Sequence, residues 1–206
     1  MVDVELSAAG LGLLTSVYFL SFAAFQLPLG VLLDRIGPRK TEAALLLVAS
    51  AGSFWFAVSE TESGLVLARS LIGIGVSACL MAAFKAFVEW FPKDKHPVTN
   101  GLILMAGGLG AMSSTAPVET ALQFTDWRGV FLGLAVLGIV ASTILYFVVP
   151  ERSAELKHPT GESLGSQIKD MGSILMVPVF YRHVPLVVFS HFEPLLVDSQ
   201  KQLGSQ

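Results

Sequence analysis

Residues 30–40 form a short charged stretch between two long apolar runs, and they read Gly30-Val-Leu-Leu-Asp34-Arg35-Ile-Gly37-Pro38-Arg39-Lys40. Residues 6–33 on one side and 43–59 on the other contain no charged side chain. A helix needs about 20 apolar residues to cross a hydrocarbon core about 30 Å thick, and both runs fall near or above that length. The Gly37-Pro38 step favours a tight turn. The stretch is therefore predicted to connect two membrane-spanning helices.

The composition of the whole chain also indicates an integral membrane protein. Of its 206 residues, 53% are hydrophobic and 14% are charged, against about 25% charged residues in typical soluble domains. The mean hydropathy of +0.67 excludes a disordered chain. With 13 Lys and Arg against 16 Asp and Glu, there is no net basic field for nucleic acid. The single cysteine, Cys79, excludes an intramolecular disulfide framework and a CxxC metal site.

Further charge-poor segments complete the predicted fold. Together they predict five spanning helices, near residues 9–33, 41–59, 64–91, 97–122 and 129–149. Membrane strands are a poor alternative because they alternate apolar and polar residues, whereas these runs are apolar on every face. The predicted fold class is an all-α integral membrane protein, a polytopic helical bundle of five complete transmembrane helices over residues 1–150. We expect a cytoplasmic linker at 151–170, and an interfacial helix, a partial span and a disordered tail within 171–206.

The distribution of Lys and Arg predicts the orientation in the membrane. Segments 34–40, 92–97 and 151–170 share one side of the predicted bundle and hold eight basic residues. The connections on the opposite side hold only Arg128. The three basic segments are therefore predicted to be cytoplasmic, in a multi-pass protein of the plasma membrane, or of the inner membrane in a bacterium.

Three motifs, in order along the chain, resemble those of one transporter family. The stretch from Gly30 to Lys40 resembles the signature between the second and third helices of the major facilitator superfamily. Residues 69–75, Arg-Ser-Leu-Ile-Gly-Ile-Gly, are similar to the fourth-helix motif, and Pro150-Glu151 is similar to the Pro-Glu after the sixth helix. The resemblance covers residues 6–190. It implies an N-terminal half that lacks the family's first helix and ends within the seventh.

The resemblance implies a gate at the charged turn. In such a gate, Asp34 faces a helix N-terminus or pairs with a neighbouring arginine, and the contact steadies one conformational state. The alternative is that the basic residues only mark a cytoplasmic turn. The fifth-helix motif of proton antiporters is absent at residues 116–121, which leaves symport and uniport open. The predicted gating residues are Gly30, Asp34, Arg35, Gly37, Arg39 and Lys40.

Four polar residues in the predicted helices are candidates for binding solute or coupling transport to protons. Arg69 either snorkels to the interface or faces a cavity, where it binds an anionic group or tunes a proton site. Gln26 either touches substrate or makes a helix–helix hydrogen bond. Glu89 either pairs locally with Lys85, four residues away, or joins the gate. Glu119 is an interfacial carboxylate or a coupling acid.

Small residues and one sequence echo complete the motifs. Gly30 and the small residues within 73–78 and 107–111 are predicted to let helices approach closely. A dinucleotide site at 73–78 is disfavoured because no strand precedes it. Asp126-Trp-Arg128-Gly129 echoes Asp34-Arg-Ile-Gly37 from the opposite side of the membrane, as inverted repeats would.

The predicted function is membrane transport of a small solute by alternating access. The chain has no HExxH, Walker A or GxSxG motif, so we expect no catalytic residue, no metal and no cofactor. The expected partners are the solute, a proton if transport is coupled to one, the lipid bilayer, and either a missing C-terminal half or a second copy. We expect a partial copy that is inactive alone. The alternative is a membrane scaffold or regulatory fragment that does not transport.

Overall fold

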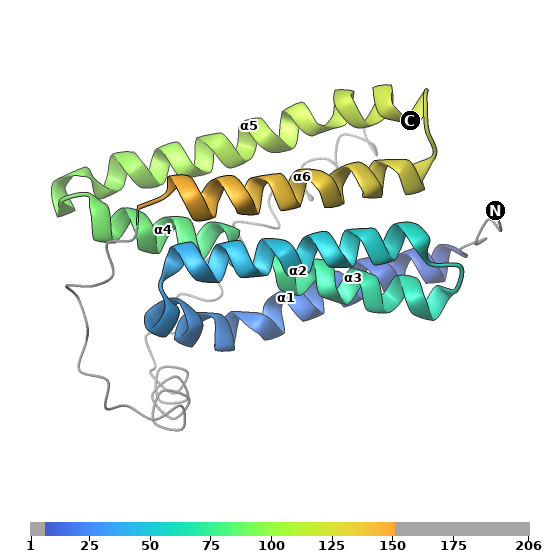
Figure 1. The fold of residues 1–206 in the computed structure, drawn as a ribbon, viewed down its shortest axis with the longest axis horizontal. Helices are drawn as coiled ribbons and strands as arrows, with labels where there is room; N and C mark the ends of the chain where they lie inside the picture. Colours follow the sequence, from blue (N-terminus) through green and yellow to red (C-terminus); the bar gives the residue numbers. More distant parts are fainter. Residues whose placement is uncertain (1–6, 151–206) are drawn as a thin grey trace, which may run out of the picture. The chain divides into compact units, whose positions relative to one another are not determined.

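The computed structural model describes residues 7–150. In this range the chain forms helices and short connections, without a strand. The predicted linker at 151–170 and the predicted elements within 171–206 lie outside the described residues. The all-α fold class is confirmed for the bundle (Figure 1).

The helices follow the predicted charge gaps. Their bounds are α1 Ala8–Ile36, α2 Pro38–Val58, α3 Glu62–Val76, α4 Cys79–Trp90, α5 His96–Leu122 and α6 Trp127–Val148, with a 3-10 turn η1 at Lys93–Lys95. Five segments are long and apolar enough to cross a membrane, and one of them combines α3 with α4. The predicted helix at 64–91 is thus interrupted at Ser77 and Ala78. The Ser77 hydroxyl and backbone N–H both donate to the Ile74 carbonyl, which favours a tight turn over a continuous helix.

Local chemistry explains where most of these helices begin. The side chains of Ser7, Thr61 and Asp126 each accept a hydrogen bond from the backbone N–H three residues later, as N-caps do. Gly37 between α1 and α2 has φ 89°, a value that L side chains rarely adopt. Pro38 then occupies the first position of α2, where its missing N–H is not needed. The Gly-Pro turn predicted from sequence is therefore confirmed.

The buried core lies around α2 and α3. One cluster of buried apolar side chains joins α1, α2 and α3, and a second joins α1, α2 and α4. Helix α2 also packs along α6. Helix α5 contacts α4 and α6, but none of its most apolar stretch is buried among the described residues. Part of the apolar surface of α5 is therefore left open within residues 7–150.

Close helix packing through glycine is confirmed at one predicted site and not at the others. A Cβ atom on Gly75 would lie 2.6 Å from the Cα atom of Ala49 in α2. One on Gly73 would lie 2.5 Å from the carbonyl oxygen of Tyr18 in α1. No described atom lies within 4 Å of such a Cβ at four glycines of exposed helix faces, where close approach stays a prediction: Gly30, Gly107, Gly108 and Gly110.

Candidate functional site

An ion pair joins the charged turn to α4. Lys85 Nζ donates to Asp34 Oδ1, which links the last turn of α1 to the middle of α4. The side chain of Asp34 is 62% exposed and that of Lys85 is 26% exposed. The partner of Asp34 is therefore a lysine 51 residues away rather than a neighbouring arginine. The expected local pair between Lys85 and Glu89 is not formed, because Lys85 turns toward α1 instead.

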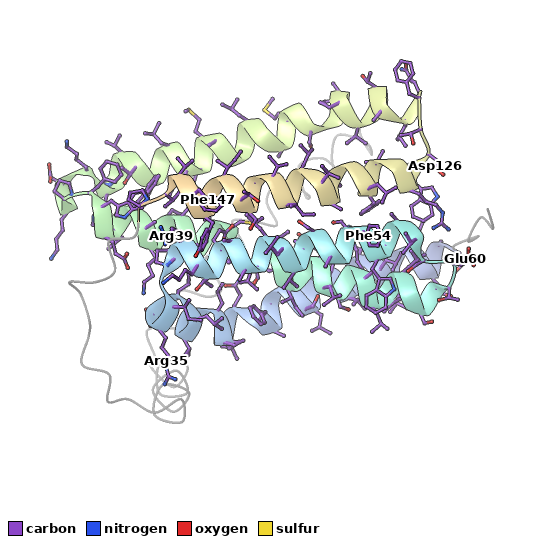
Figure 2. The ribbon with its side chains drawn as sticks, in the orientation of Figure 1. Arg35, Arg39, Phe54, Glu60, Asp126 and Phe147 are labelled. Carbon is purple, nitrogen blue, oxygen red and sulfur yellow. The ribbon has the colours of Figure 1, made fainter. Side chains whose placement is uncertain are left out.

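The other residues of the turn do not gather around Asp34. Arg35 is exposed and extends away from the helices (Figure 2), and Lys40 is also exposed. Arg39 is half-buried, and its Nη1 donates to the Val149 carbonyl oxygen at 3.1 Å. The Arg39 guanidinium also lies 5.2 Å from the centre of the Tyr146 ring. Arg39 thus binds the end of α6.

Arg69 lies between three helices. Its guanidinium carbon lies 5.0 Å from the centre of the Tyr18 ring on α1 and 6.0 Å from that of Phe56 on α2. Both distances fall within the range of a cation–π contact. The half-buried side chain therefore turns into the interface of α1, α2 and α3. Within residues 7–150 the guanidinium makes no hydrogen bond to a protein acceptor.

Gln26 contacts the interruption between α3 and α4. Its Nε2 donates to the Ser77 carbonyl oxygen at 3.3 Å. This is the helix–helix hydrogen bond that the sequence left as one of two alternatives for Gln26. The contact supplies a donor to a carbonyl at the point where the helical hydrogen-bond pattern is broken.

These contacts all join α1 to the segment formed by α3 and α4, and together we name them the α1 seam. It consists of three pairs: Tyr18 with Arg69, Gln26 with Ser77, and Asp34 with Lys85. The three α1 residues are spaced eight apart, so at 1.5 Å per residue the seam extends over about 24 Å. The aromatic contact, the helix interruption and the ion pair thus follow one another from residue 18 to residue 34 of α1.

Comparison with known proteins assigns the family. The family model described as Major Facilitator Superfamily matches residues 1–196. The chain belongs to the major facilitator superfamily. Residues 7–150 contain five helical segments able to span a bilayer, so the chain is a multi-pass membrane protein.

Three curated relatives of the chain are named as transport or extrusion proteins. The Escherichia coli K12 protein named "Probable L-galactonate transporter" is 30% identical over 157 residues, 73% of this chain and 33% of its own. "Uncharacterized transporter YybO" of Bacillus subtilis is 30% identical over 150 residues, 72% of this chain and 34% of its own. "Nitrite extrusion protein" of Bacillus subtilis is 26% identical over 127 residues, 62% and 32% respectively. The chain therefore spans about a third of the length of these relatives.

The two remaining candidates for solute binding or proton coupling lie apart from the α1 seam. Glu89 is half-buried on α4, and no ion pair to it forms among the described residues. Glu119 is exposed on α5 without a described side-chain contact. In the same part of the chain, no group of three or more His, Cys, Asp or Glu side chains could hold a metal ion.

For the candidate residues that it named, the sequence did not indicate the partners. Tyr18, Phe56 and Ser77 carry no charge and stand in apolar runs, so nothing in the local sequence distinguishes them. Polar or aromatic residues are spaced at 18, 26 and 34 on one predicted helix. That spacing did not indicate a common interface, because it turns residues 18 and 34 about 160° apart on an α-helix.

Proposed function

We propose that the chain is part of a secondary transporter that moves a small anionic solute across a membrane by alternating access. The observation that carries the proposal is the α1 seam. It connects a half-buried arginine between helices with an ion pair at the end of the bundle. A binding group and a closing contact on one interface are the two parts that alternating access requires.

Arg69 is the proposed anion-binding residue. An arginine within a membrane span is costly, and such residues usually mark substrate or ion pathways. The rings of Tyr18 and Phe56 lie near its guanidinium, while no protein acceptor among residues 7–150 takes its N–H donors. Guanidinium donors match carboxylates in a bidentate geometry. The relatives named for L-galactonate and nitrite, both anions, support this solute class.

The Asp34–Lys85 pair is the proposed gate contact. Ion pairs between exposed side chains contribute about 0–1 kcal/mol. With Asp34 62% exposed, the pair is weak enough to open and re-form during a transport cycle. In this proposal the Asp34 end faces the cytoplasm. Proton coupling is a further part of the proposal, with Glu89 and Glu119 as candidate acids.

The proposal also assigns the chain one wall of the transport path. Its relatives are about three times as long as the matched segment, and alternating access moves two halves around a site at their interface. We propose that residues 1–206 do not transport alone and that a further half or a second copy supplies the opposite wall. We also propose the plasma membrane as its location, which is the inner membrane in a bacterium.

The test is uptake into proteoliposomes by two products of the gene. One is the 206-residue chain, and the other is the product of the reading frame together with its flanking coding sequence. The solutes are L-galactonate, nitrite and a neutral hexose, each with and without a pH gradient. We expect saturable anion uptake by the longer product alone, lost in Arg69→Ala and kept in the surface control Lys93→Ala.

Each other outcome contradicts a defined part of the proposal. Uptake of only the neutral hexose would exclude the anionic solute class. Saturable uptake by the 206-residue chain would exclude its inactivity alone. A longer product that inserts in the membrane but takes up no solute of a broad anion panel would refute transport and favour the scaffold alternative. Uptake that ignores the pH gradient would remove the proton from the proposal.

A further inference from the structure

Helices α2 and α6 hold each other by reciprocal contacts at their ends. Arg39, the second residue of α2, donates to the carbonyl oxygen of Val149, the C-cap of α6. Arg128, the second residue of α6, donates through Nη1 to the carbonyl oxygens of Ala57 at 2.6 Å and Ser59 at 2.7 Å. These carbonyls belong to the last turn and C-cap of α2. The helices therefore run antiparallel, with an arginine of each at the C-terminus of the other.

The arginines occupy positions where a cation is favourable. The last carbonyls of a helix have no intrahelical donor, and the helix dipole places partial negative charge there. Arg128 is only 8% exposed, and its guanidinium also lies 4.4 Å from the centre of the Trp127 ring. Figure 2 shows Arg39 at one end of the bundle and Asp126, beside Arg128 in sequence, at the other.

Between the two ends the helices remain in close contact. The Ser142 hydroxyl donates to the Ala43 carbonyl oxygen at 2.8 Å, and this bond is buried. A Cβ atom on Gly138 would lie 3.5 Å from the Cβ atom of Ser50. Figure 1 shows α2 and α6 side by side along their lengths. Contacts at both ends and in the middle fix the rotation and the axial position of one helix against the other.

The structure gives Arg128 a different counterpart from the one that the sequence echo suggested. The echo aligned Arg128 with Ile36, the last residue of α1, which has no guanidinium to donate to a helix end. The structural counterpart of Arg128 is Arg39, because each is the second residue of its helix and each caps the other helix. What Arg39 and Arg128 share is therefore their position as the second residue of a helix, and not a four-residue sequence motif.

We propose that Arg39 and Arg128 are reciprocal helix caps that fuse α2 and α6 into one rigid unit, which moves as a single body in any conformational change of the chain. Arg39 then positions α6, a role separate from that of the gate contact Asp34–Lys85. The proposal concerns the helix pair itself and does not depend on whether the protein transports a solute.

Hydrogen exchange of the purified 206-residue chain in detergent tests the caps. In Arg128→Ala, we expect amides 55–59 to exchange at least tenfold faster, with amides 145–149 unchanged. In Arg39→Ala, we expect the reverse pattern. The milder variant Arg128→Lys keeps the charge but loses the planar set of guanidinium N–H donors, and we expect amides 55–59 to exchange at least threefold faster. Lys93→Ala, an exposed lysine in η1, is the matched control and should change neither end. Unchanged exchange of amides 55–59 in both Arg128 variants would overturn the proposal that Arg128 caps α2.

A disulfide tests the rigid unit. The 3.5 Å separation at residues 50 and 138 falls within the Cβ–Cβ range of disulfides, about 3.5–4.5 Å. In a Cys79→Ser background, we expect Ser50→Cys with Gly138→Cys to oxidise nearly completely, and exchange in α1 and α4 to stay within twofold of the reduced protein. A disulfide that does not form, or one that alters exchange in α1 or α4 more than threefold, would show that α2 and α6 move relative to each other.

Discussion

Gly75→Ala should destabilise the bundle, although alanine is the better helix former. Gly75 lies on α3, where a Cβ atom would be 2.5 Å from the Cβ and 2.6 Å from the Cα of Ala49 on α2. Ordinary van der Waals contact begins at 3.4 Å, so one helix must move by about 1 Å. Part of the obstacle is backbone, which cannot rotate away as the end of a flexible side chain would.

The magnitude follows from two opposing effects. Replacing glycine by alanine inside a helix stabilises it by about 0.8–1 kcal/mol. Inserting a methyl group into a filled interface costs about 1–3 kcal/mol. Displacement of α3 also loosens the contacts of Leu65, Ala68 and Ile72, which are buried in the same cluster. We therefore expect a net loss of up to about 2 kcal/mol in the free energy of unfolding.

The assay is equilibrium unfolding in mixed detergent micelles, followed by the fluorescence of the three tryptophans. The matched control is Gly133→Ala on α6, where no described atom lies within 4 Å of an added Cβ. Only the helix-propensity effect operates there, so we expect stabilisation by about 0.8–1 kcal/mol. Shifts of the same sign and size in both variants would refute the close contact between α3 and α2.

Three further predictions concern the proposed transport and the orientation. Asp34→Asn removes a weak ion pair, so we expect the uptake rate of the longer gene product to fall about two- to fivefold at equal expression, as a loss of up to about 1 kcal/mol implies; unchanged uptake would refute the gate contact. Arg69→Lys keeps the charge but loses the planar fork, and we expect the half-saturating anion concentration to rise at least tenfold, with equal affinity as the contrary result. Single cysteines at positions 40 and 94 should react with a membrane-impermeant reagent only from the cytoplasmic side, and one at position 61 only from outside; labelling of position 40 from outside would reverse the orientation.

The fold could be predicted because the bilayer imposes a simple rule on sequence. A spanning helix must be apolar over about 20 residues, so the charge-free runs locate the helices directly. Local chemistry also settled the turn at Gly37-Pro38, where the backbone needs the glycine. The interruption at Ser77 was not predicted, because a serine in an apolar run is equally compatible with a continuous helix.

Contacts between distant helices could not be predicted in the same way. The local spacing of Lys85 and Glu89 favoured an i,i+4 pair, but such pairs contribute only about 0.2–0.5 kcal/mol. The rotation of α4 instead brings Lys85 to Asp34. The glycines show the same limit. A Cβ atom added at residue 73 or 75 would meet a neighbouring helix, whereas one added at Gly107 or Gly108 would meet no described atom within 4 Å. Composition alone does not distinguish the two cases.

Three arginines illustrate how the structure assigns roles that the sequence does not determine. Arg128 donates to two backbone carbonyls, and Arg39 donates to one carbonyl and lies against a ring. Those donors are used in holding α2 against α6, which gives both residues a structural role. Arg69 has aromatic rings near its guanidinium and no protein acceptor within residues 7–150. Because a cation–π contact leaves the N–H groups at the edge of the guanidinium able to donate, Arg69 is the arginine of the three best suited to receive an anionic ligand.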